Sequence, residues 1–243
     1  MDKRKIANFL DLTDDFLCSG YRRERKEINF DEKPCATVEM NESKIDKTNA
    51  IEEIAARIKK CSNCQLAANR KNAVPGEGVL QPLVMVIGEG PGADEDARGR
   101  PFVGRAGQLL DKMLASIDLS RDVNCFIANV VKCRPPGNRD PYPEETAACS
   151  GFLMTQIAAL KPGFILIAGR VAAQSVLNTT ESVSNLRGRE LALNVDGASY
   201  PVLVTYHPAA LLRSENLKRP AWEDLKLLRG KLQSTASFMT TEA

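Results

Sequence analysis

Apolar runs typical of buried strands alternate with helical stretches along most of this chain, which predicts an α/β protein. We expect a three-layer α/β/α sandwich around a central, mostly parallel four-stranded sheet. The strand candidates are short and rich in β-branched residues, and the stretches between them repeat apolar residues at helical spacing. The candidates are residues 83–87, 125–131, 164–168, 190–195 and 202–206.

The first 48 residues differ in character from the rest. Residues 3–19 carry apolar side chains at helical spacing and predict a short amphipathic helix. Residues 20–48 are mainly charged and polar, as in a linker or a partly disordered segment. We therefore divide the chain into an N-terminal helix and linker, residues 1–48, and one globular domain, residues 49–243.

The central loop, residues 88–107, reads GEGPGADEDARGRPFVGRAG and follows the first strand candidate. It is rich in glycine and acidic residues, contains one large aromatic residue, Phe102, and precedes a helix predicted over residues 106–117. In an open α/β sheet, ligands bind beyond the carboxyl ends of the strands, where this loop must lie. The loop is therefore the first candidate for an active site.

The other elements continue the alternation. A loop rich in proline, glycine and arginine, residues 132–143, follows the second strand candidate, and a loop over residues 207–213 follows the last. The final helix is expected after Pro220, because proline is favoured in the first turn of a helix. Further helices are predicted over residues 50–60, 144–160 and 170–177.

Composition narrows the functional classes. The formal net charge is only +2, so nucleic-acid binding would need a local basic face. No stretch approaches the roughly 18 uninterrupted apolar residues of a spanning helix, and the N-terminus lacks the apolar core of a signal peptide. We expect a cytoplasmic protein with no membrane partner. In a reducing compartment, the seven cysteines favour metal or cluster ligation over disulfides.

Four cysteines are candidates for such a site. Cys61 and Cys64 form a C-x-x-C pair after a predicted helix, and Cys133 and Cys149 bracket a loop and the start of another helix. Four thiolates bind either Zn²⁺ or a 4Fe-4S cluster, and the spacing alone does not decide between them. A C-x-x-C pair is also a redox motif, although no thioredoxin-like pattern follows it. The remaining thiols, Cys18, Cys35 and Cys125, are interpreted as ordinary cysteines.

Three loops that each follow a predicted strand carry long motifs: GEGPGADEDARGRPFVGRAGQLL, ANVVKCRPPGNRDP and HPAALLR. Together with CSNC and Cys149, they resemble the family 4 uracil-DNA glycosylases of the uracil-DNA glycosylase superfamily. The resemblance covers roughly residues 50–232. It implies a DNA repair enzyme that flips uracil out of DNA and hydrolyses its N-glycosidic bond. An abasic site would remain, and the strand would not be cleaved.

The resemblance also implies a cofactor and partners. It favours a structural 4Fe-4S cluster on Cys61, Cys64, Cys133 and Cys149, with zinc as the alternative. Uracil-containing DNA is the expected partner of the glycosylase domain, residues 49–243, without a nucleotide cofactor. We expect a monomer.

Three residues are assigned to the extruded base by the resemblance. Phe102 would stack on the pyrimidine, the alternative being a core phenylalanine. The side-chain amide of Asn129 would pair with the N3–H and O4 edge of uracil. Without the resemblance, an asparagine bonded to backbone would be favoured. His207, the only histidine, would donate a hydrogen bond to O2 of the leaving base even when neutral.

Glu89 is the candidate for orienting or activating the attacking water. A related family places its base at the position that Gly90 occupies here, so a direct equivalent is missing. Asp94, Glu95 and Asp96 are therefore rivals of Glu89.

The remaining assignments concern DNA. Leu211 would wedge into the gap that the flipped base leaves, and Arg213 and Arg134 would contact phosphates. Each of these residues has the alternative of simple packing or solvation. Glycines permit close approach of backbone N–H groups to the base or a phosphate, and the candidates are Gly88, Gly90 and Gly92.

Several further classes of function stay open at this point. Residues 88–93 match a G-x-G-x-x-A dinucleotide-binding pattern, but that pattern needs a helix to start within the glycines. Pro91 and the stretch up to Gly104 are expected to delay the helix by about ten residues. A non-catalytic module that binds uracil or damaged DNA is a second class, and a zinc-binding structural protein is a third.

Overall fold

The structure, a computed structural model, describes residues 47–241. The helix predicted over residues 3–19 and nearly all of the linker predicted over residues 20–48 lie outside the described residues. The division at residue 48 therefore stays a prediction. The first described helix, α2, spans Lys47–Lys60 and begins three residues before its predicted start.

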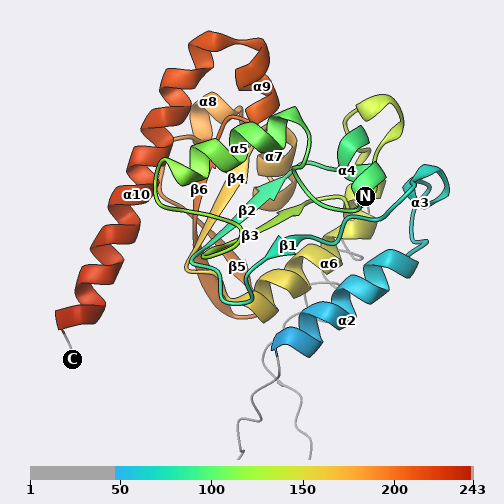
Figure 1. Cartoon of the computed structure of the whole chain (residues 1–243), viewed down its shortest axis with the longest axis horizontal. Coiled ribbons are helices and arrows are strands. Elements are labelled where there is room, and N and C mark those ends of the chain that lie inside the picture. The colour runs from blue at the N-terminus through green and yellow to red at the C-terminus, as the bar shows by residue number, and fades with distance from the viewer. Residues whose placement is uncertain (1–46, 242–243) are drawn as a thin grey trace, which may run out of the picture. The chain divides into compact units, whose positions relative to one another are not determined.

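A six-stranded sheet lies at the centre of the described part (Figure 1). Its order is β1-β3-β2-β4-β6-β5; the inner four strands are parallel, and β1 and β5 pair antiparallel at the two edges. The strands are β1 (Glu77–Gly78), β2 (Val84–Gly88), β3 (Cys125–Asn129), β4 (Phe164–Ala168), β5 (Leu191–Val195) and β6 (Ala198–Thr205). The predicted α/β class is confirmed, but the prediction of four strands is wrong because the two antiparallel edges extend the parallel centre.

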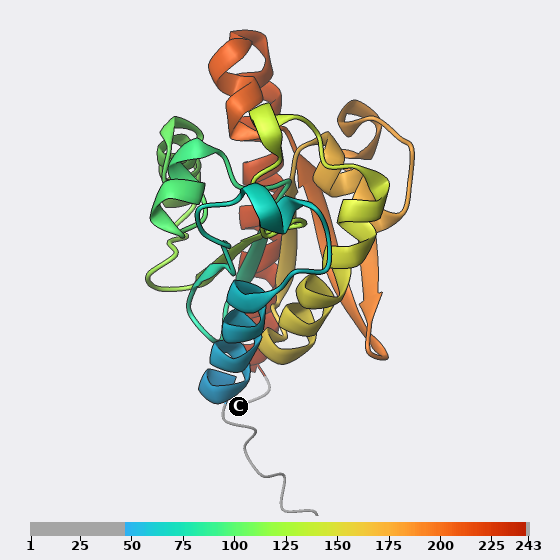
Figure 2. The same cartoon turned by 90° about the vertical axis from the view of Figure 1, so that its right-hand side faces the viewer.

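Helices cover both faces of this sheet and make three layers. Alternate side chains of a strand point to opposite faces, so Val84 and Val86 of β2 belong to one core and Met85 and Ile87 to the other. The first core packs against α5 (Arg105–Ala115) and α10 (Lys218–Thr241), and the second against α2, α6 (Pro143–Leu160) and α7 (Arg170–Leu177). Figure 2 shows α2 and α6 side by side, with α10 beyond the sheet.

The helix prediction fails in the central loop, where α4 (Ala93–Arg98) follows the glycines immediately. Glu95 caps this helix by accepting a hydrogen bond from Gly92 N at 3.1 Å. The predicted delay of the helix is therefore wrong, and it cannot be used against a dinucleotide-binding pattern in this loop. The remaining short helices are α3 (Leu66–Asn69), α8 (Val183–Leu186), α9 (Pro208–Arg213), η1 (Pro136–Asn138) and η2 (Glu215–Leu217).

Strand register brings the ends of the parallel strands together. Gly88 at the end of β2 pairs with Asn129 at the end of β3, and Ala168 of β4 pairs with Thr205 of β6. Four loops therefore leave the sheet at one edge. Over residues 47–241, none of the helices combines the length and apolar character that crossing a membrane requires.

Candidate active site

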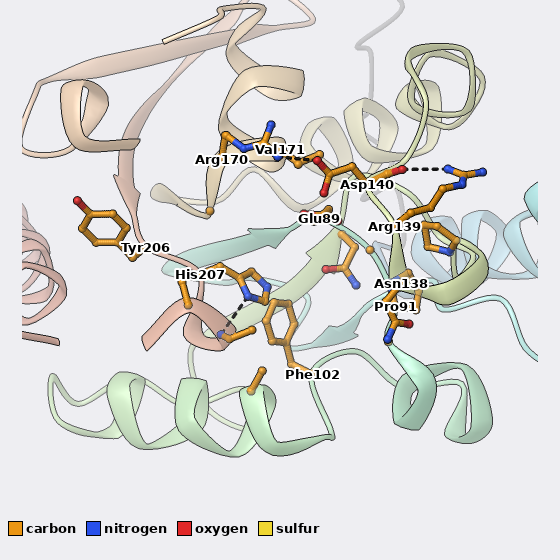
Figure 3. A pocket seen from close by; sticks show the side chains of 18 of the residues that line it. Glu89, Pro91, Phe102, Asn138, Arg139, Asp140, Arg170, Val171, Tyr206 and His207 are labelled. Carbon is orange, nitrogen blue, oxygen red and sulfur yellow. Dashed lines mark hydrogen bonds and ion pairs between the residues drawn. The ribbon is translucent and has the colours of Figure 1, made fainter. Parts of the chain in front are cut away.

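A cavity of about 620 Å³ lies at the carboxyl ends of the parallel strands (Figure 3). Its lining comes from four segments that are far apart in the sequence. Glu89 follows β2, Asn129 ends β3, Arg170 follows β4 and His207 follows β6. The central loop is thus one of several walls, and the parallel register assembles the site.

Asn129 is the most unusual residue in this cavity. It is only 1% exposed, and both polar atoms of its amide are buried with no hydrogen-bond partner among the described residues. The alternative of an asparagine bonded to backbone is therefore contradicted. A Cβ on Gly88 would lie 2.5 Å from Asn129 Oδ1, so only glycine fits behind the amide. An unpaired buried amide costs about 1–3 kcal/mol and is available to a ligand.

Phe102 lies beside Asn129, because a Cβ on Gly88 would come within 2.5 Å of both side chains. It lines the cavity and also packs in the core, at 6% exposure, so both interpretations of this residue describe part of its environment. Its centroid lies 5.6 Å from that of the His207 ring, with 33° between the planes. Its φ of 51° is rare for a residue with a side chain, and Arg121 holds its carbonyl at 2.9 Å. Gly107 allows the backbone to pass, because a Cβ there would collide with the Phe102 carbonyl.

His207 presents one ring nitrogen to its own helix. As the N-cap of α9, its Nδ1 accepts a hydrogen bond from Ala209 N at 3.1 Å, so the hydrogen-bond pattern places the proton of the neutral ring on Nε2. Burial, followed by the nearby charge of Arg213, lowers the pKa of His207 to about 4. The side chain is therefore a neutral N–H donor near pH 7.

Glu89 has the ionisation behaviour of a general base. Burial, followed by the charge of Asp140, raises its pKa to about 7, while Arg170 acts in the opposite direction. A carboxylate with a pKa near 7 accepts a proton efficiently at physiological pH.

Two of its rivals are occupied by structural hydrogen bonds. Glu95 Oε1 accepts from the N–H groups of Val103 and Gly104, both at 2.8 Å, and so shapes the loop that carries Phe102. Asp96 is buried and accepts from Lys71 N at 2.8 Å. Asp94 is the third rival, and its carboxylate lies close to Gly104.

Four polar residues of the cavity were not singled out from the sequence. Arg170 pairs with Asp140 at 2.5 Å on the side of Glu89, and the Tyr206 hydroxyl lies 2.9 Å from that of Ser184. Arg170 stands two residues after the end of β4, so the rule that sites follow strand ends could have found it. Asp140 lies in a loop whose path depends on the fold.

The residues predicted to contact DNA have different surroundings. Arg213 is exposed and reaches the cavity, and Arg134 donates to Asn138 Oδ1 at 2.8 Å. The prediction that Leu211 wedges into DNA does not fit the structure, because Leu211 is only 4% exposed and packs in the core against α5 and α10. Its neighbour Leu212 is 45% exposed, since the next position of a helix faces another direction. Gly90 and Gly92, two of the loop glycines predicted to lie close to the base or a phosphate, line the cavity.

The four candidate cysteines come together on the α2 and α6 side of the sheet. Cys61, Cys64, Cys133 and Cys149 all line one small, enclosed cavity. Backbone and side-chain N–H groups point at their sulfurs: Arg70 Nη1 donates to Cys133 Sγ at 3.1 Å, and backbone donors reach Cys149 Sγ and Cys61 Sγ at 3.4 Å. Within residues 47–241, no three Cys, His, Asp or Glu side chains converge closely enough to hold a single metal ion.

The three remaining cysteines are separate from this cluster. Cys125 is buried in the core on the α5 side, and its burial raises the pKa of the thiol to about 12. Its interpretation as an ordinary thiol agrees with this environment. Cys18 and Cys35 lie outside the described residues.

Comparisons with known proteins agree on one family. A family model described as the uracil DNA glycosylase superfamily matches residues 75–226. A type-4 uracil-DNA glycosylase of Pyrobaculum aerophilum is 42% identical over 74% of this chain and 93% of its own. One of Archaeoglobus fulgidus is 40% identical, covering 76% and 96%, and one of Thermotoga maritima is 43% identical, covering 72% and 91%.

Proposed function

This chain belongs to the uracil-DNA glycosylase superfamily, and we propose that it excises uracil from DNA with Asn129, His207 and Glu89 as its catalytic residues. The observation that carries this proposal is the Asn129 amide, which is buried in the cavity without a partner among the described residues. A flipped uracil would supply the missing hydrogen bonds.

Base recognition follows from the donors and acceptors of Asn129. Its Oδ1 accepts from uracil N3–H, and its Nδ2 donates to O4. Cytosine presents an acceptor at N3 and a donor at C4, so both contacts would fail. The Phe102 ring stacks on the pyrimidine, and its place beside the His207 ring, 5.6 Å away, puts stacking and catalysis on one base.

The reaction breaks the bond between uracil N1 and C1′ of the sugar. The bonding electrons leave with the base, negative charge develops on its oxygens, and the sugar becomes cationic. His207 Nε2–H donates to O2 of the departing base, as a neutral donor whose low pKa prevents its protonation at pH 7. The Glu89 carboxylate accepts a proton from water as the water oxygen bonds to C1′.

A monofunctional hydrolase fits the lining of the cavity. In the described part of the chain, the cavity is lined by arginines and carboxylates but by no lysine that could form a Schiff base. The products are free uracil and an abasic site, with the strand intact.

The four cysteines Cys61, Cys64, Cys133 and Cys149 fit a 4Fe-4S cluster. All four cysteines line one small, enclosed cavity, and a cluster bound there would take its ligands from them, with Zn²⁺ as the alternative. The N–H donors at three of the sulfurs suit the charge of a thiolate cluster. When bound, the cluster supplies a structural cross-link, because hydrolysis transfers no electron. Ligation needs reduced cysteines, which favours a reducing compartment, and we therefore propose the cytoplasm.

Single-turnover cleavage tests this function. Anaerobically purified protein is mixed with an oligonucleotide carrying one uracil, with thymine and cytosine oligonucleotides as controls, and the visible spectrum of the same sample is recorded. We expect uracil release, no cleavage of the controls, and a broad absorbance band near the violet end of the visible spectrum. Tight binding of the uracil oligonucleotide without release of uracil would favour a non-catalytic damage-binding module. Bound zinc in a sample without visible absorbance would favour Zn²⁺ at the four cysteines.

A further inference from the structure

Lys132 is the largest polar side chain that is almost completely buried, at 1% exposure. Lysine is rarely buried unless its amine is satisfied. Its Nζ donates to the main-chain carbonyl of Asn129 at 2.9 Å and to Gln156 Oε1 at 2.7 Å. Both acceptors are neutral oxygens, so hydrogen bonds, and not an ion pair, hold this amine in position. One of its two acceptors belongs to the residue that we propose reads the base.

Gln156, the second acceptor of the Lys132 amine, is itself held in place by a hydrogen bond. Gln156 lies on α6, and its Nε2 donates to the Pro75 carbonyl at 2.8 Å. The main chain of Lys132 is also fixed, because its carbonyl accepts from Val74 N at 2.8 Å and its N–H donates to Cys149 Sγ at 3.4 Å. Lys132 therefore joins the end of β3 to α6 and to the cysteine cluster.

Asn129 depends on such an anchor. Its amide has no hydrogen bond to any described residue, so no polar contact of the side chain fixes its direction. The direction must come from the backbone at the end of β3. There, Val130 N donates to the Gly88 carbonyl at 2.9 Å on one side, and the Asn129 carbonyl accepts from Lys132 Nζ.

We propose that Lys132, held by Gln156, is a positioning residue that fixes the Asn129 amide in the direction needed to read uracil. This inference rests on the proposed function. Lys132 does not touch the base, and its effect passes through the Asn129 backbone. Displacing a recognition group by about 1 Å is enough to reduce a rate on the order of 100-fold.

The test compares three single variants of the full chain and one double variant. Lys132→Met removes both hydrogen bonds of the amine but keeps an apolar stem of similar length. Gln156→Leu leaves the lysine in place but removes its anchor. Asn124→Ala is the matched control, because Asn124 organises the opposite end of β3, where it accepts from Ser120 N at 2.8 Å and donates to the Asp118 carbonyl at 2.9 Å.

Each variant is measured in four ways: single-turnover rate at saturating enzyme, affinity for uracil-containing and for undamaged DNA, visible absorbance, and unfolding midpoint. Lys132→Met should lower the rate by about 10- to 100-fold and reduce the preference for uracil-containing over undamaged DNA by a similar factor. Absorbance per folded protein and affinity for undamaged DNA should stay within about twofold. The double variant with Gln156→Leu should be no worse than Lys132→Met alone, since both act on one contact.

Asn124→Ala should lower the unfolding midpoint but leave the rate and the DNA preference within about twofold. The inference is overturned if Lys132→Met and Gln156→Leu behave like Asn124→Ala, or if their rate losses only follow a loss of visible absorbance. If Lys132→Met does not fold, Gln156→Leu decides by the same readouts. Failure of the unmodified protein to release uracil would instead overturn the proposed function.

Discussion

At the scale of single residues, the buried amide of Asn129 is suited to binding a ligand but lowers the stability of the folded protein. Its desolvation is not offset by any hydrogen bond to the described residues. Only glycine fits at position 88, since a Cβ there would meet both Asn129 and Phe102. The free protein therefore keeps a recognition group ready at a cost in folding free energy.

This leads to a prediction for Asn129→Leu, which is similar in size and has no polar atoms. The free energy of unfolding should rise by about 1 kcal/mol, because an unpaired buried amide is removed. Uracil excision should fall at least about 100-fold, since the base contacts are lost. Denaturant unfolding and single-turnover cleavage measure the two effects. A destabilised variant would show that the amide is satisfied in the folded protein.

The pH dependence of cleavage should report Glu89. Its pKa is raised to about 7, and the deprotonated form is the one that accepts a proton from water. The single-turnover rate should therefore rise with pH below about 7 and level off above it. His207, with its pKa lowered to about 4, stays neutral over this range and adds no second step. Glu89→Gln should be slow and nearly independent of pH.

Asp140→Asn provides the control for that assignment. The charge of Asp140 helps to raise the pKa of Glu89, while the charge of Arg170 opposes it. Removing the negative charge should lower the pKa of Glu89 and move the rise in rate to lower pH. An unchanged profile in both variants would assign the titration to another group.

At the scale of elements, α9 places two neighbouring leucines in different surroundings. Leu211 packs toward α5 and α10, whereas Leu212 is exposed on the same helix. The motif alone suggested the first as the DNA wedge, and burial contradicts this.

We therefore expect different defects from the two alanine variants. Leu211→Ala should destabilise the protein by about 2–5 kcal/mol, as truncation of a core leucine does. Leu212→Ala should leave stability within about 0.5 kcal/mol. If Leu212 fills the gap in the duplex, its loss should slow cleavage of double-stranded more than single-stranded substrate. Equal rates on both substrates would remove Leu212 from that role.

At the scale of the whole molecule, the cysteine cluster links segments that the chain alone leaves far apart. Cys61 and Cys64 follow α2, Cys133 lies after β3 and Cys149 is on α6. Closing such long loops restricts the unfolded chain, and ligand binding to the folded state adds to stability.

Cys149→Ser should therefore abolish most of the visible absorbance and lower the free energy of unfolding by about 2 kcal/mol or more. Cys125→Ser is the matched control, because this thiol is equally buried but lies in the other core. It should keep the absorbance. Loss of absorbance in both variants would mean that the signal reports folding instead of ligation by Cys149.

The parallel centre of the sheet was predictable from the sequence, because strands buried on both faces, such as β2 and β4, are continuous apolar runs. The sequence did not predict β1, whose two residues have no periodicity, or α4, whose acidic residues are fixed by contacts with distant loops. The resemblance of the loop motifs to a known family indicated Phe102, Asn129 and His207, whereas the four cysteines were already candidate ligands by residue type.

Which side chains face one another depends on tertiary packing. The burial of Leu211, the pairing of Asp140 with Arg170 and the contact of Lys132 with the Asn129 carbonyl all depend on segments that meet across the fold. The unpaired state of the Asn129 amide is likewise a property of its surroundings. Residue type fixes what a side chain can do, but its partners and its exposure to water are set by long-range packing.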